Sequence, residues 1–282
     1  MSLSALVARL EHATVLDRVA DPVRKATQRV LPPGAVRDAL HGVWLGHPVH
    51  PPAVQLPLGA FIGTAIIDLL PGPHRETEVL LGVGVAATLP AVLAGAADLS
   101  ESHEQQQRVG VVHAAANVVA VSLYSAALVA RRRNRGGKAL GYAGLAVATL
   151  GGFLGGHLSQ RQATGANHAE EFPHLVAPGW QELCGIDDLP EGQPRRLLLD
   201  TAAVLALRQD GQVWVLSDRC SHFSGPLHQG EFSDGCVTCP WHGSRFRLDD
   251  GAVVRGPATA PQPAFDVRVE GGRVLVCLPG AG

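Results

Sequence analysis

The sequence lacks an excess of charge of either sign, because 23 lysines and arginines stand against 25 aspartates and glutamates in 282 residues. A chain without a basic surface is not expected to bind a phosphate backbone, so nucleic acid is excluded as a partner. The sequence also lacks the evenly spread cysteines of a disulfide scaffold, since three of its five cysteines lie between Cys220 and Cys239. Cysteine clustered in this way beside histidine indicates a metal site.

The N-terminus lacks the uninterrupted apolar segment of a cleavable signal peptide, because charged residues break it every few positions up to Leu45. We therefore expect an amphipathic helical lead-in over residues 1–45. Charged residues make up only 17% of the chain, and the mean hydropathy is slightly positive, which is unusual for a wholly soluble protein. Part of the chain is therefore expected to lie in lipid.

Four stretches poor in charge follow, each close to the ~20 residues that a helix needs to cross the hydrocarbon layer. Their glycines and alanines would let membrane helices approach closely. Polar residues stand mainly at the ends of the stretches, whereas the helices of a soluble bundle would carry a polar stripe at helical period. The sequence thus predicts a transmembrane four-helix bundle over residues 46–160. The stretches are Ala53–Leu70, Val79–Leu99, Val109–Ala130 and Ala139–Leu158.

A polar linker is predicted over residues 161–173, and after it the period of the apolar residues changes to two. Short apolar runs such as Val204–Leu207 and Val213–Leu216 alternate with turn signals such as Gln209-Asp210-Gly211. Residues 174–282 are therefore expected to form an all-β domain. The predicted fold class is an N-terminal all-α transmembrane four-helix bundle followed by a C-terminal all-β domain.

Two short boxes in the β-domain each offer one thiolate and one imidazole. They are Cys220-Ser221-His222 and Cys239-Pro240-Trp241-His242, with sixteen residues between His222 and Cys239. Zinc knuckles space their paired ligands two to four residues apart, and the first box is tighter than that. In a [2Fe–2S] cluster with mixed ligands, two cysteines hold one iron and two histidines hold the other. Each box would then supply one ligand to each iron, so the spacing favours such a cluster over zinc.

With their surroundings, the two boxes resemble the Rieske family over about residues 172–279. Gly225-Pro226-Leu227 follows the first box, Gly243-Ser244-Arg245-Phe246 follows the second, and Gly256-Pro257-Ala258 resembles the proline loop that covers the cluster. The resemblance implies one [2Fe–2S] cluster and a set of residues around it. The implied ligands are Cys220, His222, Cys239 and His242, with Ser244 as a donor to a bridging sulfide and Pro257 in the covering loop.

Two departures from the cytochrome-complex members of that family indicate its ferredoxin type. Those members join an extra cysteine in each box as a disulfide, whereas this chain has Gly225 and Trp241 at the two places. This chain also has Phe246 where they have a tyrosine whose hydroxyl donates to a cluster cysteine. The missing donor implies a reduction potential near the low end of the Rieske range, around −150 mV.

Other polar residues of the β-domain have plainer interpretations. Cys184, Cys236 and Cys277 are interpreted as packed thiols, the second of them in a strand that leads to the second box. His228 is interpreted as a solvent-facing side chain, since both imidazole positions are filled.

The segment Gly46-His47-Pro48-Val49-His50-Pro51 resembles a His-Pro-x-His-Pro box that begins a family of predicted four-helix membrane proteins of unknown function, over about residues 41–165. If the spans alternate in direction, five ionisable residues gather near one membrane face, and such residues are functional candidates. His113 and His157 are the candidate axial ligands of a haem b. The alternative is that the histidines hydrogen-bond helix ends. The five are His47, His50, Asp98, His113 and His157.

Two functions fit these observations. The first is a membrane-anchored electron carrier that passes single electrons between redox partner proteins, a reductase and an acceptor. The second is a quinone oxidoreductase subunit with haem in the bundle. A Rieske oxygenase would need a further mononuclear iron site after the cluster, and the sequence ends at Gly282.

We expect a multi-pass protein of the cell membrane, in contact with lipid. The basic Arg131–Lys138 loop favours a β-domain on the outer side, whereas the basic residues of the N-terminal segment favour the cytoplasmic side. We expect the cytoplasmic side.

Overall fold

The computed structural model describes residues 3–72 and 75–279, and these residues fold as two compact units. The helical unit contains the described residues up to Val36 and those from Pro48 to Gly165. The β unit contains residues 37–47 and the described residues from Ala166 onward. The predicted fold class, helical first and all-β second, is confirmed.

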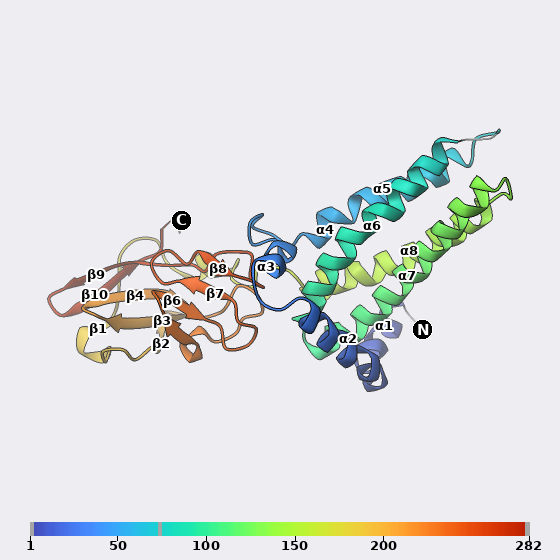
Figure 1. The fold of residues 1–282 in the computed structure, drawn as a ribbon. Coiled ribbons are helices and arrows are strands. Elements are labelled where there is room, and N and C mark those ends of the chain that lie inside the picture. The colour runs from blue at the N-terminus through green and yellow to red at the C-terminus, as the bar shows by residue number, and fades with distance from the viewer. Residues whose placement is uncertain (1–2, 73–74, 280–282) are drawn as a thin grey trace. The chain divides into compact units, whose positions relative to one another are not determined.

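In the part of the chain that the structure describes, three helices are long and apolar enough to cross a membrane. At most 22% of the apolar window of each span is buried, so most of the residues in these windows are at least partly exposed. The unit therefore offers its surroundings an apolar belt, as lipid-facing helices do. The three are α6 (Glu76–Ser100), α7 (Glu104–Arg132) and α8 (Lys138–Gly156), the last continued by the π-helical turn η2 (His157–Arg161) (Figure 1).

The first predicted span is broken. Within Ala53–Leu70, the helix α5 (Gln55–Ile67) is separated at Val54 from the short preceding helix α4 (His50–Ala53). Pro57 lacks the N–H that would donate to the Ala53 carbonyl across this break. The 13 residues of α5 rise about 20 Å, less than the thickness of the hydrocarbon layer. Four spans therefore remain a prediction. Phe61 of α5 nevertheless stacks on Tyr124 of α7, with ring centroids 3.7 Å apart.

Two N-terminal helices, α1 (Leu3–Glu11) and α2 (Asp17–Val30), are joined by a short 3-10 turn, η1 (Thr14–Leu16). Both helices pack at the end of the bundle where α6 turns into α7 (Figure 1). The chain also leaves the bundle at this end, because Gln106 of α7 donates to the Gln162 carbonyl over 2.8 Å. At the other end, Asp68 forms a buried ion pair with Arg131 at 2.5 Å. Arg131 also donates to the Thr77 hydroxyl at 2.8 Å.

The β unit contains three antiparallel sheets, and the strands predicted from the period of two are confirmed. Asp210 and Gly211, both at positive φ, close the β3–β4 hairpin as their turn signal predicted. The first sheet is β1 (Gln181–Gly185), β10 (Arg273–Cys277) and β9 (Asp266–Glu270); the second is β2 (Arg195–Leu199), β3 (Ala202–Gln209) and β4 (Gln212–Ser217); the third is β5 (Glu231–Ser233), β6 (Cys236–Thr238), β7 (Arg245–Arg247) and β8 (Val253–Arg255).

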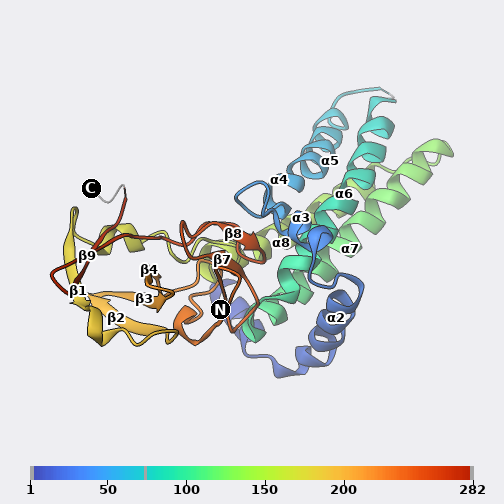
Figure 2. The same cartoon turned by 60° about the vertical axis from the view of Figure 1, so that its left-hand side comes forward.

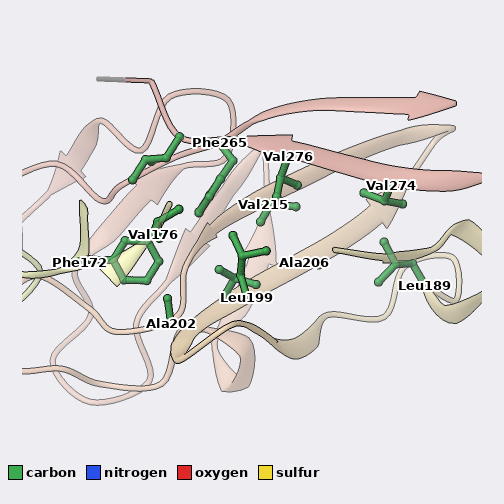
Figure 3. Packing of buried hydrophobic residues seen from close by; sticks show 12 residues of the cluster. Phe172, Val176, Leu189, Leu199, Ala202, Ala206, Val215, Phe265, Val274 and Val276 are labelled. Carbon is green, nitrogen blue, oxygen red and sulfur yellow. The ribbon is translucent and has the colours of Figure 1, made fainter. Parts of the chain in front are cut away.

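The first two sheets enclose an apolar core. Figure 3 shows Leu199, Ala206 and Val215 from the second sheet gathered with Val274 and Val276 of β10. Phe172, in the 3-10 turn η3 (Phe172–Leu175), adds its ring to this core, so the last residues of the predicted linker belong to the β unit. A second core lies under the third sheet and includes Cys220, Cys239 and Phe246.

A short N-terminal segment belongs to the β unit as well. Residues 37–47, here called the strap, follow the start of α3 (Ala35–His41). The Asp38 carboxylate accepts the Gly256 N–H at 3.0 Å, and a methyl group added to Gly256 would lie 3.1 Å from Val43. The lead-in predicted for residues 1–45 is therefore divided between the two units. Figure 2 shows α2 and α3 as separate helices, and the division falls within α3, after Val36.

Candidate metal centre

The first box is held by a tight loop that follows β4. The Cys220 N–H donates to the Gly225 carbonyl at 2.9 Å, and the Ser224 N–H donates to the Cys220 carbonyl at 2.8 Å. Ser224 adopts a left-handed conformation, with φ at +59°, which lets the loop reverse. Cys220 is buried within this loop and His222 is half-buried.

The second box, between β6 and β7, has the same loop. The Cys239 N–H donates to the Ser244 carbonyl at 2.8 Å, and the Gly243 N–H donates to the Cys239 carbonyl at 3.1 Å. Gly243 has φ at +74° and occupies the position that Ser224 has in the first loop. Two matched loops thus each present a cysteine at their start and a histidine two or three residues later, with Cys239 buried and His242 half-buried.

The structure brings the four side chains together as two pairs. The Nδ1 atoms of His222 and His242 lie 3.3 Å apart, and the two thiols share a hydrogen bond. Two nitrogens bound to one metal at about 2.1 Å and near the tetrahedral angle lie about 3.4 Å apart. Over the described residues, no three His, Cys, Asp or Glu side chains gather as ligands of a single ion. The arrangement therefore fits two metal atoms with two protein ligands each.

The hydrogen bond between the two thiols shifts their pKa values in opposite directions. The pKa of Cys239 is lowered, because the Cys220 thiol donates to its sulfur and the N–H groups of Trp241 and His242 point at it. The pKa of Cys220 is raised well above its usual value by the shared hydrogen bond and by burial, although the N–H groups of His222 and Phe223 oppose the change. One thiolate is thus stabilised in advance, and a metal must displace the other proton.

A third loop closes over the second box. Ser244 is fully buried, and its hydroxyl oxygen accepts the Ala258 N–H at 2.9 Å. This bond ties the second box to the Gly256-Pro257 segment, where Pro257 is also buried. Because the Ser244 oxygen accepts here, its own proton is left to be donated, as a donor to a cluster sulfide must be.

Gly225 and Trp241 occupy the places of the absent disulfide. All five cysteines lie outside disulfide bonds. A methyl group on Gly225 would lie 2.7 Å from the Cys239 sulfur and 3.2 Å from the Trp241 ring. The indole fills the space beside the second loop, and Gly225 lets it approach.

One structural residue of the site escaped the sequence analysis. Gln262 is 1% exposed, and its amide nitrogen donates to the Ser217 and Arg219 carbonyls at 2.9 and 2.6 Å. Its amide oxygen accepts the Ser221 N–H at 3.1 Å. Gln262 therefore holds the first loop in place. The sequence feature that could have indicated a buried, structural Gln262 is its position between two prolines in an apolar segment.

The interpretation of His228 was wrong. Its ring nitrogen and its backbone N–H both contact the Asp218 carboxylate, each at 2.8 Å. Asp218 is 3% exposed, and a buried carboxylate requires such partners. His228 is thus a structural partner of the residue that precedes the first loop by two positions.

The two candidate haem ligands lie in the helical unit and contact other groups. His113 Nδ1 is 2.7 Å from the Gly151 carbonyl, and its Nε2 is 3.1 Å from the Asn117 amide. His157 Nε2 is 2.7 Å from the Glu11 carboxylate. The ring near His113 is that of His50, with centroids 6.3 Å apart. These contacts are hydrogen bonds between packed helices. Gly151 and Asn117 lie within α8 and α7 and not at their ends, so the His113 contacts differ from the helix-end bonds of the alternative.

Comparison with known proteins gives two family matches. Residues 179–266 match the family described as Rieske [2Fe-2S] domain, and residues 46–168 match the family described as Predicted membrane protein (DUF2231).

Individual relatives match the β unit. The chain is 38% identical over 100 residues to the 3-phenylpropionate/cinnamic acid dioxygenase ferredoxin subunit of Escherichia coli K12, a match that covers 35% of this chain and 92% of that protein. It is 34% identical over 94 residues to human apoptosis-inducing factor 3, which covers 33% of this chain and 16% of that one. Among solved structures, the ferredoxin of carbazole 1,9a-dioxygenase from Nocardioides aromaticivorans is 31% identical with a TM-score of 0.34, covering 35% of this chain and 97% of that one.

Proposed function

We propose, from the premise that this chain belongs to the Rieske family, that it is a membrane-anchored carrier of single electrons. Cys220, His222, Cys239 and His242 would bind one [2Fe–2S] cluster, the cysteines on one iron and the histidines on the other. The cluster would supply the one-electron chemistry.

The observation that carries this proposal is the pairing of the four side chains by two loops with the same hydrogen bonds. The pairing divides the site into a buried cysteine side and a half-buried histidine side. Electrons would pass to and from partners at the histidine side. Trp241, 51% exposed, adds an apolar surface next to His242 for such encounters.

Three observations support membrane anchoring. The three candidate spans bury at most 22% of their apolar windows. Residues 46–168 match a family described as membrane proteins. The ion pair of Asp68 and Arg131 and the polar contacts of Arg108 lie near the ends of the spans, where charges are tolerated.

The curated relative is the ferredoxin subunit of a dioxygenase, which suggests the class of partner. We propose a flavoprotein reductase as electron donor and an oxygenase as acceptor, bound in turn at the histidine side. The basic N-terminal segment packs at the end of the bundle where the chain leaves for the β unit. We propose that this segment and the β unit are both on the cytoplasmic side of the membrane. Protease added outside intact spheroplasts should then leave the β unit uncut.

The cluster assignment is tested by electron paramagnetic resonance of the reduced full-length protein. A histidine-ligated cluster has a lower average g-value than one with four cysteines, and His222→Cys or His242→Cys should shift the signal. Cys236→Ser is the matched control, because this buried strand thiol lies outside the site, and its spectrum should be unchanged. An unaltered spectrum in both histidine variants would rule out these ligands.

The carrier function is tested with the same preparation in detergent. A dioxygenase-type reductase with NADH should reduce the cluster, and a matching oxygenase should reoxidise it, both followed by visible absorbance. A cluster that dithionite reduces and the reductase does not would contradict the proposed donor class.

The haem and quinone alternative has less support, because the Nε2 atoms of His113 and His157 already face Asn117 and Glu11. An optical spectrum decides it, since a bound haem gives an intense Soret band. Loss of quinol-dependent cluster reduction in His113→Ala or His157→Ala, with the dithionite-reduced signal intact, would revive it.

A further inference from the structure

Helix α2 is amphipathic in the opposite sense to an ordinary surface helix. Its polar side packs against the protein, where Asp17 binds Arg108 at 2.7 and 2.9 Å and Gln28 donates to the Ser100 carbonyl at 3.1 Å. Its apolar side is exposed. The valines on that side and one preceding it in η1 are Val15, Val19, Val23 and Val30, exposed by 62, 54, 45 and 76%.

The exposed valines form one continuous stripe. At 100° per residue the three valines of α2 fall within an arc of about 40°, and Val15 precedes them in η1. Three basic residues, Arg18, Lys25 and Arg29, lie exposed on the flank next to this stripe, within about 40° of one another. The acidic residues of α2 are on the packed side or beside it, and each is paired with an arginine.

The contacts of α2 also determine its depth relative to the spans. Ser100 directly follows the candidate span that ends at Leu99, and Arg108 lies one turn inside the next, which starts at Glu104. Asp17 at the start of α2 and Gln28 near its end are both held at this turn. Helix α2 therefore lies along the end of the bundle, at the level where the spans leave the hydrocarbon layer.

We propose that α2 lies in the membrane–water interface, with its valine stripe in the outer acyl region and Arg18, Lys25 and Arg29 against anionic phospholipid headgroups. This inference rests on the proposed membrane anchoring and adds a lipid class to it. An in-plane helix gains from apolar burial, and each basic residue at an anionic surface adds attraction. The basic flank is what selects an anionic lipid surface over a second protein as the occupant.

The test is photo-crosslinking in the full-length protein, reconstituted into phosphatidylcholine vesicles with a minority of phosphatidylglycerol. Three variants each carry one photoreactive p-benzoylphenylalanine. It replaces Val23 on the stripe in the first variant. It replaces Asp21 on the other side of α2 in the second and Leu89 in the span in the third, and these two variants are the controls. Leu89 is 63% exposed on α6. Mass spectrometry of the intact protein identifies each adduct.

We expect lipid adducts at Val23 in amounts similar to Leu89, and about tenfold fewer at Asp21. The phosphatidylglycerol share at Val23 should exceed that at Leu89 by about twofold or more. Combining Arg18→Gln, Lys25→Gln and Arg29→Gln should remove this enrichment and keep the adducts.

Lipid adducts at Leu89 with none at Val23, or crosslinks from Val23 to protein, would overturn the interfacial position and leave the anchoring intact. Equal phosphatidylglycerol shares at Val23 and Leu89 would overturn the headgroup preference. No lipid adducts at Leu89 would overturn the anchoring itself, and the inference with it.

Discussion

The two units differ in how many of their large apolar side chains they bury. In the β unit, large residues such as Leu205 and Phe246 are fully buried, and the metal centre rests on that core. In the helical unit, Val118 and Leu150 are 64 and 60% exposed, and the helices pack through a small cluster in which Phe61, Leu81 and Tyr124 lie among alanines. The β unit is thus organised around exclusion of water, and the helical unit around helix contacts that remain specific when apolar side chains gain little from packing. Changes in the two units should therefore have different consequences.

The largest expected effect is at the metal centre. Cys239→Ser should abolish the cluster, and with it the visible absorbance and the paramagnetic signal, because one iron loses a thiolate. The β unit should also unfold at lower temperature, since bound metal stabilises only the folded state. Differential scanning calorimetry should show this shift for the β unit and no change for the helical unit, and a shift of both would mean that the two units unfold together.

In the helical unit the largest effect should come from the buried ion pair. Asp68→Asn leaves Arg131 without its charge partner and should cost about 3–5 kcal/mol. The free energy of unfolding in mixed detergent micelles, followed by helical circular dichroism, measures it. Asp68→Asn combined with Arg131→Gln is the matched control, and it should recover most of the loss. A single variant as stable as the parent would mean that the pair contributes nothing.

Close helix packing should have a smaller effect. A methyl group on Gly84 would lie 2.5 Å from the Phe61 ring, and that ring is held against Tyr124. Gly84→Ala should therefore cost about 1–3 kcal/mol. Gly82, on the same helix, has open space at this position, and Gly82→Ala should be neutral or slightly stabilising. The same detergent titration compares the two, and equal effects would count against close packing.

The smallest change in stability should accompany a change in potential. Phe246→Tyr adds a hydroxyl in the core behind the cysteines, as in relatives with the tyrosine, and should raise the midpoint on the order of tens of millivolts. Protein-film voltammetry measures the shift. Phe232→Tyr, on β5 and packed against the same core, is the control and should leave the potential unchanged. A fall or no change would remove the argument from the missing hydroxyl.

The fold class and the two boxes could be predicted from the sequence because their signals are local. Period-two strands, apolar helices and the two boxes each occupy fewer than thirty consecutive residues. The contacts that hold the site are not local. Gln262 reaches Ser221 across 41 residues, and Asp38 reaches Gly256 across 218. No periodicity or motif spacing connects positions so far apart.

The number of spans was hard to predict for another reason. The apolar composition continues from Ala53 to Leu70, whereas the helix α5 covers only Gln55–Ile67, after a break at Val54 across which Pro57 has no N–H to donate. The burial of Asp68 within that stretch also depended on Arg131, which no local pattern connects to it.

The strap has a consequence for how this chain can be divided. Because residues 37–47 belong to the β unit while the residues on both sides belong to the helical unit, the polypeptide passes between the units three times. A single proteolytic cut at residue 165 would leave the ferredoxin part held to the other fragment by the strap. A ferredoxin made from residue 166 onward would lack the carboxylate that binds Gly256. A division of the chain between the two family matches therefore does not separate the two folding units, and exchange of the β unit must carry the strap with it.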